Sequence, residues 1–235
     1  MTNEILLRGN TTTVKSASAK ESSLSARLRA VAKSSLPPAV LKELQRYRAL
    51  NGSERLTYAK LRMLSGMGVA SFQRRPDTRG VRTILFVCFG NIMRSPMCEA
   101  LLKRMLPEPG DRRFVVTSAG LHAVPGREAH PWAIAAARNL GISLEDHRAR
   151  LLNTEMVDSA DVIFAMDYSN FVQILSRWKS AGQKVFMLGA YSSNKYPETE
   201  IPDPYHGSAL ETVECYKVLG ACVHNLAQDL GQRGA

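Results

Sequence analysis

The sequence lacks any long apolar run and any paired cysteine motif. Its longest obvious apolar stretch, Ile84 to Phe89, is far shorter than the roughly 18 residues that a membrane-spanning helix needs. The four cysteines form no CxxC pair, so neither a zinc site nor a disulfide framework is indicated. No internal repeat is present, and the opening MTNEILLRGNTTT has no sustained apolar segment typical of a secretory signal. These absences favour a cytoplasmic protein.

The composition is that of a protein that can bury a core, but its charge is unevenly distributed. The 235 residues correspond to one large domain, or to one domain of about 150 residues with an appendage. Residues 1–79 contain 15 Lys and Arg against 5 Asp and Glu, whereas residues 80–235 contain 16 of each kind. The net charge of +10 therefore lies entirely in the first third of the chain.

The basic first third has little capacity to fold alone. Residues 10–37 are rich in Ser, Thr and Lys and contain few large apolar side chains, which predicts disorder because little surface can be buried. Two short helical patterns follow between Pro38 and Met67, and Asn51-Gly52-Ser53 separates them. We expect Ser53 to be the N-cap of the second helix.

A change of pattern near residue 80 divides the chain into a basic N-terminal extension with its linker, 1–80, and a domain, 81–235. The domain alternates short apolar strands with helical stretches, which predicts an α/β fold with a four-stranded parallel sheet and helices on both faces. The strands are expected at 83–88, 114–118, 161–166 and 184–188. The helices are expected at 95–105, 131–140, 169–179 and 209–230, with Gly141 ending the second. Ligands bind such sheets beyond the carboxyl ends of the strands.

The first strand leads directly into CFGNIMRS, from Cys88 to Ser95, and then into a helix. Backbone N–H groups of such a loop converge on an anion, and the positive end of the helix dipole favours the thiolate form of Cys88. Arg94 can hold two oxygens of a tetrahedral oxyanion in the same loop. A lone cysteine ending a strand is usually a small buried hydrophobe. With Gly90, Arg94 and Ser95 beside it, the pattern favours attack of a thiolate on phosphorus.

The extended string CFGNIMRSPMCE resembles the low-molecular-weight protein tyrosine phosphatase family, whose signature is C-x5-R-S/T followed by P-M and an acidic residue. The resemblance covers about residues 82–230. It continues through TSAGLHA at 117–123, HRAR at 147–150, DVIFAMD at 161–167 and IPDPY at 201–205. It implies the fold of that family and hydrolysis of phosphotyrosine through a phosphocysteine intermediate. It implies no cofactor and no metal, because the loop amides and Arg94 supply the positive charge.

The resemblance also implies a role for each catalytic residue. Cys88 is the nucleophile and Arg94 binds the phosphate. Asp203, in the DP dipeptide, protonates the departing oxygen and later takes a proton from the attacking water. Ser95 helps the sulfur to leave in the second step, and Asn91 braces the loop. Asp-Pro is also an ordinary turn signal, and Ser and Asn are common in turns and caps.

The remaining expected contacts are with the substrate. Phe89 and Tyr205 are predicted to form the walls of a slot for the phosphotyrosine ring, deep enough to disfavour the shorter phosphoserine. Gly90, Ile92 and Met93 complete the loop around the phosphate. The five histidines show no metal-binding spacing, so no metal site is predicted.

Two departures from the family pattern are informative. Val124 stands where eukaryotic members carry an aromatic residue at the rim, which resembles the bacterial branch associated with tyrosine autokinases and exopolysaccharide export. Met93 replaces a second cysteine that usually protects the nucleophile by forming a disulfide with it. Cys98, in the following helix, is the nearest alternative thiol in the sequence.

Three other functions compete with tyrosine phosphatase activity as explanations of the sequence. A related branch reduces arsenate with two further cysteines, but Cys215 and Cys222 fall on the last predicted helix, where core packing explains them better. A second branch hydrolyses phosphoarginine and tends to have Thr where this chain has Ile92. A non-catalytic phosphate-binding or nucleic-acid-binding module would suit the basic character. The presence of Cys88, Arg94 and Asp203 together argues against it.

The expected partners follow from the two parts of the chain, the domain at 81–235 and the basic residues 1–79. The domain predicts phosphotyrosine proteins as substrates, including a membrane tyrosine autokinase. Residues 1–79 predict docking on an acidic surface or an anionic membrane, and a solvated basic tail explains the same charge equally well. No specific nucleic-acid partner is expected, because the basic residues lie in a poorly structured segment.

Overall fold

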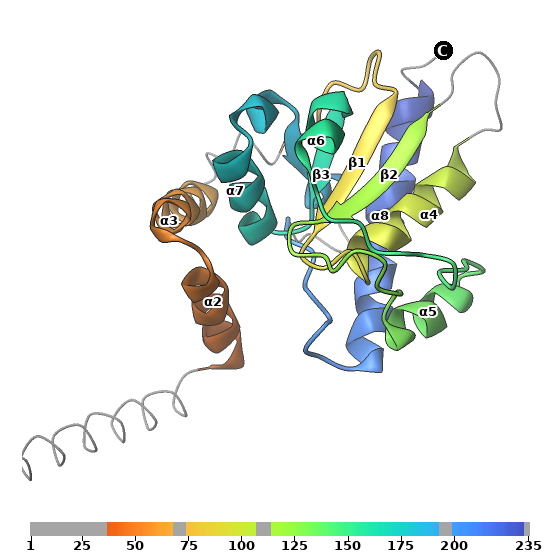
Figure 1. Ribbon diagram of the computed structural model, residues 1–235, viewed down its shortest axis with the longest axis horizontal. Helices are drawn as coiled ribbons and strands as arrows, with labels where there is room; N and C mark the ends of the chain where they lie inside the picture. Colours follow the sequence, from red (N-terminus) through yellow and green to blue (C-terminus); the bar gives the residue numbers. More distant parts are fainter. Residues whose placement is uncertain (1–36, 68–73, 107–113, 193–198, 233–235) are drawn as a thin grey trace, which may run out of the picture. The chain divides into compact units, whose positions relative to one another are not determined.

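A computed structural model describes residues 37–67, 74–106, 114–192 and 199–232 of the chain. The chain divides into two units, the first ending at Ala49 and the second starting at Leu50. The described part of the first unit is helix α2 (Pro38–Ala49) (Figure 1). The segment expected to be disordered, 10–37, lies outside the described residues except for its last position. The proposed domain boundary at residue 80 stays a prediction.

The second helical pattern forms α3 (Gly52–Gly66), which belongs to the second unit. The prediction of Ser53 as its N-cap was wrong, because Asn51 caps this helix. The Asn51 Oδ1 accepts a hydrogen bond from the Glu54 N–H at 3.0 Å, and the Asn51 N–H donates to the Glu54 carboxylate at 2.9 Å. This reciprocal capping box satisfies two backbone donors, which a serine two residues later cannot do.

The sheet confirms the predicted fold class. Its strands are β1 (Thr83–Cys88), β2 (Val115–Gly120), β3 (Val162–Ala165) and β4 (Val185–Met187). They pair in parallel in the order β2-β1-β3-β4, and their ends lie within two residues of the expected ones. Side chains of β1 alternate between two cores: Ile84 and Phe86 enter one, and Leu85 and Val87 enter the other.

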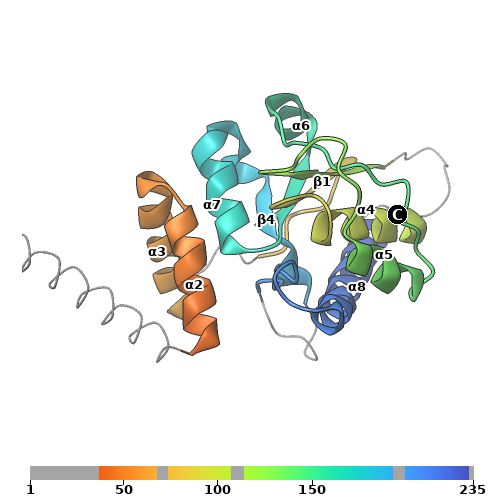
Figure 2. The same cartoon turned by 60° about the horizontal axis from the view of Figure 1, so that its bottom comes forward.

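Helices cover both faces of the sheet (Figure 2). One face packs against α4 (Arg94–Met105), α5 (Pro131–Arg138) and α8 (Ala209–Gln232). The other packs against α6 (Thr154–Ser159) and α7 (Tyr168–Arg177), with α3 lying against α7. The single-turn η2 (Lys179–Gln183) precedes β4, and η3 (Leu188–Tyr191) follows it.

Local signals explain where several of these helices begin and end. Gly141 has a φ of 69°, a left-handed conformation that glycine adopts without strain, and it follows the end of α5 as predicted. The short helix α6 was not predicted, although Asn153 caps it through the Met156 N–H. In the part of the chain that the structure describes, none of the helices combines the length and apolar character that a bilayer crossing requires.

Candidate active site

The phosphate loop, residues 88–95, joins the carboxyl end of β1 to the first turn of α4. The Asn91 N–H donates to the Cys88 Sγ at 3.2 Å, and the Ser95 Oγ lies 3.0 Å from the same sulfur. The thiol therefore lies at the base of the loop, with polar groups directed at it from both sides.

Asn91 holds the loop in shape. Its φ of 53° is in the left-handed region, which asparagine tolerates better than most residues. Its Nδ2 donates to the Ser95 Oγ at 2.9 Å and to the Ser118 Oγ at 2.8 Å, while its Oδ1 accepts from the Arg150 N–H at 2.8 Å. These bonds connect the loop to β2 and to the 147–150 segment, which is the geometry that a bracing residue needs.

The loop also packs closely on the end of β2. A Cβ added to Gly120 would lie 2.8 Å from the Asn91 N and 2.8 Å from the Phe89 O, closer than side-chain carbons approach in proteins. Only glycine fits there without displacing the loop. The sequence contains this residue in TSAGLHA, but only the packing shows why the position requires it.

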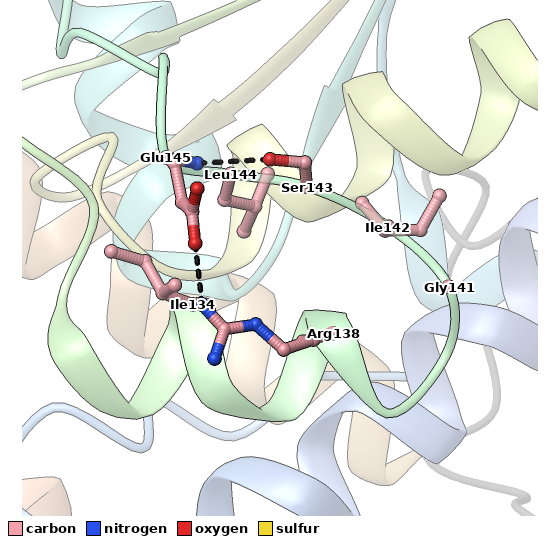
Figure 3. A pocket seen from close by; sticks show the side chains of 7 residues that line it. All are labelled: Ile134, Arg138, Gly141, Ile142, Ser143, Leu144 and Glu145. Atoms are coloured by element: carbon pink, nitrogen blue, oxygen red, sulfur yellow. Dashed lines mark hydrogen bonds and ion pairs between the residues drawn. The ribbon is translucent and has the colours of Figure 1, made fainter.

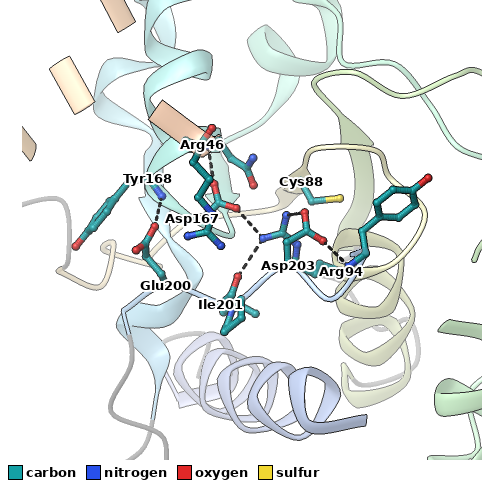
Figure 4. Close-up of polar contacts among 12 residues, drawn as sticks. Arg46, Cys88, Arg94, Asp167, Tyr168, Glu200, Ile201 and Asp203 are labelled. Atoms are coloured by element: carbon teal, nitrogen blue, oxygen red, sulfur yellow. Dashed lines mark hydrogen bonds and ion pairs between the residues drawn. The ribbon is translucent and has the colours of Figure 1, made fainter. Parts of the chain in front are cut away.

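Arg94 is fully buried and is held by carboxylates (Figure 4). Its Nη1 donates to Asp167 at 2.7 Å and its Nη2 to Asp203 at 2.5 Å. Burial alone would lower the pKa of Arg94, but the charges of Asp203, Asp167 and Cys88 outweigh it, so the pKa is raised above its ordinary value. Arg94 is therefore a permanent cation that interacts electrostatically with Cys88.

Asp167 is a site residue to which sequence reasoning gave no role. It lies two residues after the end of β3, and its side chain accepts from Arg94 through Oδ2 and from the Asn170 N–H through Oδ1. It thus orients Arg94 and caps α7 at the same time. The available signal was a charged residue at the carboxyl end of a buried parallel strand, the edge where ligands bind.

Asp203 lies in the acid segment, residues 199–205. Its side chain is 33% exposed, its Oδ2 accepts from Arg94, and its Oδ1 accepts from the Tyr205 N–H at 3.1 Å. The Ile201 N–H donates to the Met166 carbonyl at 2.8 Å, and the Ile201 carbonyl accepts from Arg94 at 3.0 Å. The contact between Arg94 and Asp203 therefore brings together two residues that are 109 positions apart in the sequence.

The two predicted aromatic walls are both partly exposed, Phe89 at 45% and Tyr205 at 38%. The Phe89 ring stacks on His122 with 4.5 Å between ring centroids. The Tyr205 ring makes an edge contact with His130 at 5.8 Å, and the Arg127 guanidinium lies 5.8 Å from its centroid. Each aromatic surface is therefore supported by neighbours while keeping an open face.

Ile92 and Met93 are loop residues whose side chains do not face the site. Both side chains are buried in the core on the α4 side of the sheet. The Ile92 carbonyl accepts from the His130 N–H at 2.9 Å, and the Met93 carbonyl accepts from the Tyr216 hydroxyl at 2.9 Å. The carbonyls of these two residues are thus tied back to α5 and α8.

Glu99 and His147 contact the phosphate loop or the residues that hold it. The Glu99 carboxylate accepts from the Ser118 hydroxyl at 2.6 Å and from the Arg150 guanidinium at 2.7 Å. Burial opposes ionisation of Glu99, but hydrogen bonds from Lys103 and Ser118 and the Arg150 charge outweigh it and lower the pKa. The His147 Nε2 lies 2.7 Å from the Asn91 carbonyl, and burial lowers the pKa of this imidazole.

The other three cysteines are buried, free thiols. Burial raises the pKa of Cys98 well above its ordinary value, and burial raises the pKa of Cys215 and of Cys222 to about 12. Cys215 and Cys222 lie in the hydrophobic core on α8, as the packing interpretation predicted. Within the described residues, no three His, Cys, Asp or Glu side chains gather as a metal site would require.

Two surface pockets lie beside α5. One, of about 310 Å³, is lined by residues from Ile134 to Glu145, and the Arg138 guanidinium donates to the Glu145 carboxylate there (Figure 3). The other, of about 540 Å³, extends from Arg127 to Arg138. Neither is lined by Cys88, Arg94 or Asp203. The larger pocket nevertheless adjoins the site, because its lining residue His130 contacts Tyr205 and donates its N–H to the Ile92 carbonyl of the loop.

Comparisons with known proteins match this geometry to one family. The sequence model described as low molecular weight phosphotyrosine protein phosphatase matches residues 83–235. The chain belongs to that family. Its predicted enzyme class, a protein-tyrosine-phosphatase, is confirmed with it.

Relatives and solved structures agree with this membership. The chain is 39% identical over 125 residues to the probable low molecular weight protein-tyrosine-phosphatase EpsP of Ralstonia nicotianae, covering 53% of this chain and 79% of EpsP. The tyrosine phosphatase Wzb of Escherichia coli K30, solved in complex with sulphate, is 32% identical with a TM-score of 0.58; the match covers 64% of this chain and 99% of that one. The YwlE arginine phosphatase of Geobacillus stearothermophilus is 32% identical with a TM-score of 0.56, covering 64% and 94%.

Proposed function

We propose that this chain hydrolyses phosphotyrosine in proteins through a phosphocysteine intermediate, with residues 81–235 as the catalytic domain. Cys88 is the nucleophile, Arg94 and the loop amides bind the phosphate, and Asp203 is the general acid. The observation that carries the proposal is the buried Arg94, which binds Asp203 directly and interacts electrostatically with Cys88. That arrangement brings a nucleophile, an anion-binding cation and a carboxyl group to one point.

In the first step the Cys88 thiolate attacks phosphorus and the bond to the phenolic oxygen breaks. The proton of the Asp203 carboxyl group moves to the departing oxygen, so that a neutral phenol leaves. Arg94 and the amides of residues 89–95 stabilise charge on the three non-bridging oxygens. A bound phosphate also competes with Asp203 for the Arg94 Nη2, which frees the carboxyl group to face the leaving oxygen.

In the second step water attacks the phosphocysteine. The Asp203 carboxylate takes a proton from this water while the phosphorus–sulfur bond breaks, and inorganic phosphate and the thiolate are released. The Ser95 hydroxyl, 3.0 Å from the sulfur, donates to the departing thiolate. Ser95 and the Asn91 N–H thus stabilise the leaving sulfur in this step.

Replacing the nucleophile tests this mechanism. Cys88→Ser is expected to lower turnover of p-nitrophenyl phosphate by about 10⁴-fold or more, because a hydroxyl beside this loop is a far poorer nucleophile. Cys222→Ala removes a buried thiol on α8 and is expected to keep the parent's kcat. Near-normal activity of Cys88→Ser would overturn the phosphocysteine mechanism.

The proposed specificity for phosphotyrosine is supported by the exposed aromatic faces of Phe89 and Tyr205. The likeness to the YwlE arginine phosphatase makes phosphoarginine the competing substrate. Ile92, which replaces the threonine typical of that branch, favours phosphotyrosine. Comparing kcat/KM on a phosphotyrosine peptide and a phosphoarginine peptide separates the two, with the first expected to be higher. Arsenate reduction is disfavoured, because the buried Cys215 and Cys222 belong to the core.

A membrane tyrosine autokinase of a bacterial exopolysaccharide system is the proposed physiological substrate. Two features support it: the aliphatic Val124 at the rim, which is exposed, and the similarity to EpsP and Wzb. A pull-down with the Asp203→Ala variant, which binds phosphotyrosine but releases it slowly, tests the assignment. Recovery of a tyrosine-phosphorylated kinase supports it, and recovery of unrelated phosphoproteins alone would contradict it.

Residues 1–79 are proposed to dock the enzyme on an anionic membrane. Helix α3 is built into the second unit, so the charge available for docking lies mainly in residues 1–49, with 9 Lys and Arg against 3 Asp and Glu. Each such residue near anionic lipid contributes about 1 kcal/mol. Co-sedimentation with anionic vesicles is therefore expected at low salt and not at high salt. Absence of binding at low salt would leave a solvated basic tail.

A further inference from the structure

Helix α3 lies outside the residues that match the phosphatase family, yet it is part of the unit that holds the active site. Its Tyr58 and Leu61 side chains are buried in the core that also contains α7. The Glu54 carboxylate, which closes the capping box, accepts a further hydrogen bond from the Ser176 hydroxyl of α7 at 2.8 Å. Helix α3 is thus fixed to α7 by apolar packing and by a specific polar contact.

The second half of α3 reaches the acid segment. The Arg62 Nη2 lies 2.7 Å from the Glu200 Oε2, and the Arg62 guanidinium lies 4.7 Å from the centre of the Tyr168 ring. The Ser65 hydroxyl is 2.9 Å from the Tyr168 hydroxyl. These contacts join α3 to Tyr168, the first residue of α7, and to Glu200, three residues before Asp203.

Glu200 is bound on both sides. Its Oε1 accepts from the Tyr168 N–H at 2.9 Å, while its Oε2 binds Arg62 (Figure 4 shows the Tyr168 contact). Its side chain is 16% exposed and that of Arg62 is 35% exposed, so water screens this ion pair less than a surface pair. The carboxylate therefore fixes the start of the acid segment to α3 and to the residue after Asp167.

The ion pair between Arg62 and Glu200 matters when the substrate binds. The Arg94 Nη2 holds Asp203 in the structure. If a bound phosphate takes this donor, as the proposed mechanism requires, the acid segment loses one of its fixed points. The contacts of Ile201 with Met166 and Arg94 remain, and so does the Arg62–Glu200 pair. A general acid must stay within hydrogen-bond reach of the leaving oxygen, so small displacements of Asp203 reduce its efficiency.

We propose that Arg62 of α3 is a positioning residue for the general acid, acting through its ion pair with Glu200. The proposal rests on the proposed role of Asp203 and adds to it a control element that the family-matched domain does not contain. Arg62 itself touches neither the substrate nor the reacting atoms. A segment of the N-terminal extension thereby becomes part of the machinery that sets the rate of leaving-group departure.

Arg62→Gln in the full chain tests the proposal by the dependence of kcat/KM on the leaving group. This parameter reports the steps up to departure of the phenol, and the ratio between two substrates is independent of the fraction of folded enzyme. We expect kcat/KM for phenyl phosphate to fall roughly 3- to 10-fold while that for p-nitrophenyl phosphate changes little, because a poor leaving group needs the acid more. Arg62→Lys should restore part of the loss.

Companion variants make the result specific. Glu200→Gln, which removes the charge but keeps an oxygen for the Tyr168 N–H, is expected to show the same selective loss. The double variant should be no worse than either single one, because both remove one interaction. Lys60→Gln, which removes an exposed positive charge from the same helix, should leave both substrates unchanged.

Two outcomes separate this proposal from the function on which it rests. An Arg62→Gln enzyme with the parent's ratio between the two substrates would overturn the positioning role, even if its melting temperature falls. If Asp203→Asn also kept the parent's ratio, the acid assignment itself would fail. A changed ratio in Asp203→Asn and an unchanged one in Arg62→Gln would therefore reject only the role of α3.

Discussion

The phosphate loop and the acid segment are held in place in different ways. In the loop, Asn91, Arg94 and Ser95 are almost completely buried. Asn91 and Arg94 each have several hydrogen bonds to neighbouring elements, and Ser95 bonds within the loop and to the Ala119 carbonyl of β2. In the acid segment, Asp203 and Tyr205 are partly exposed, and the segment depends on a few contacts from elsewhere. The comparison shows a buried, extensively bonded loop beside an exposed carboxyl group whose position depends on a few contacts, which suits the proposed roles of anion site and general acid.

Asp203→Asn is the strongest test of the acid segment alone. The amide keeps an oxygen for Arg94 but cannot deliver a proton to the phenol, so kcat/KM for phenyl phosphate is expected to fall about 10²- to 10⁴-fold. The loss on p-nitrophenyl phosphate should be much smaller, because its phenol is the stronger acid. Steady-state kinetics on both substrates measures this. Equal losses would remove Asp203 from the acid role and make it a structural partner of Arg94.

Gly120→Ala tests whether the phosphate loop is held as rigidly as its packing indicates. The new Cβ would meet the Asn91 and Phe89 backbone at 2.8 Å, so the loop must shift. We expect kcat to fall by about tenfold or more and the free energy of unfolding to fall by about 1–3 kcal/mol. Denaturant unfolding and turnover of p-nitrophenyl phosphate measure the two effects.

The matched control for that variant is Gly220→Ala, inside α8. Beyond the helix's own nearby backbone and the two chain neighbours, no atom lies within 4 Å of the added Cβ there, so the free energy of unfolding should rise by about 0.5–1 kcal/mol and kcat should not change. If Gly120→Ala behaved like this control, the loop would be more adaptable than its packing indicates.

The loop's response to oxidation gives a smaller effect. Because position 93 is Met, the loop lacks the usual second thiol that could form a disulfide with Cys88. Burial raises the pKa of Cys98, which disfavours the thiolate form that disulfide formation requires. Peroxide should therefore inactivate the enzyme with little recovery on adding thiol. Met93→Cys is expected to increase the recovered fraction. Met93→Ala, which opens a similar space without a thiol, should not. Full recovery of the parent would show that another cysteine reaches Cys88.

The parts of the candidate site that could be predicted from the sequence are local in the chain. The strand, loop and helix from β1 to α4 are contiguous, so spacing and helix-dipole arguments point to Cys88, Arg94 and Ser95. Asp203 was proposed from its motif, and the roles of all four residues stay predictions. The fold class also followed from the alternation of apolar strands and helices. The ends of the predicted strands and helices of the domain lie within two residues of the observed ends.

The parts that the sequence did not predict depend on tertiary contacts. Asp167 and Glu200 are ordinary acidic residues in the sequence, and only the packing places one on Arg94 and the other on Arg62. The integration of α3 into the second unit was missed for the same reason, since a short amphipathic pattern does not reveal its partner. The N-cap error arose because Ser53 and Asn51 are both good caps, and the reciprocal bond with Glu54 decided between them.

Detection of the covalent intermediate tests the central claim most directly. The enzyme is mixed with p-nitrophenyl phosphate, quenched within its first turnovers, and digested for mass spectrometry. The account predicts a phosphoryl group on the peptide that contains Cys88, absent from Cys88→Ser and present again in a Cys222→Ala control. Rapid hydrolysis with no phosphorylated Cys88 at any quench time, or with the phosphoryl group on another residue, would contradict it.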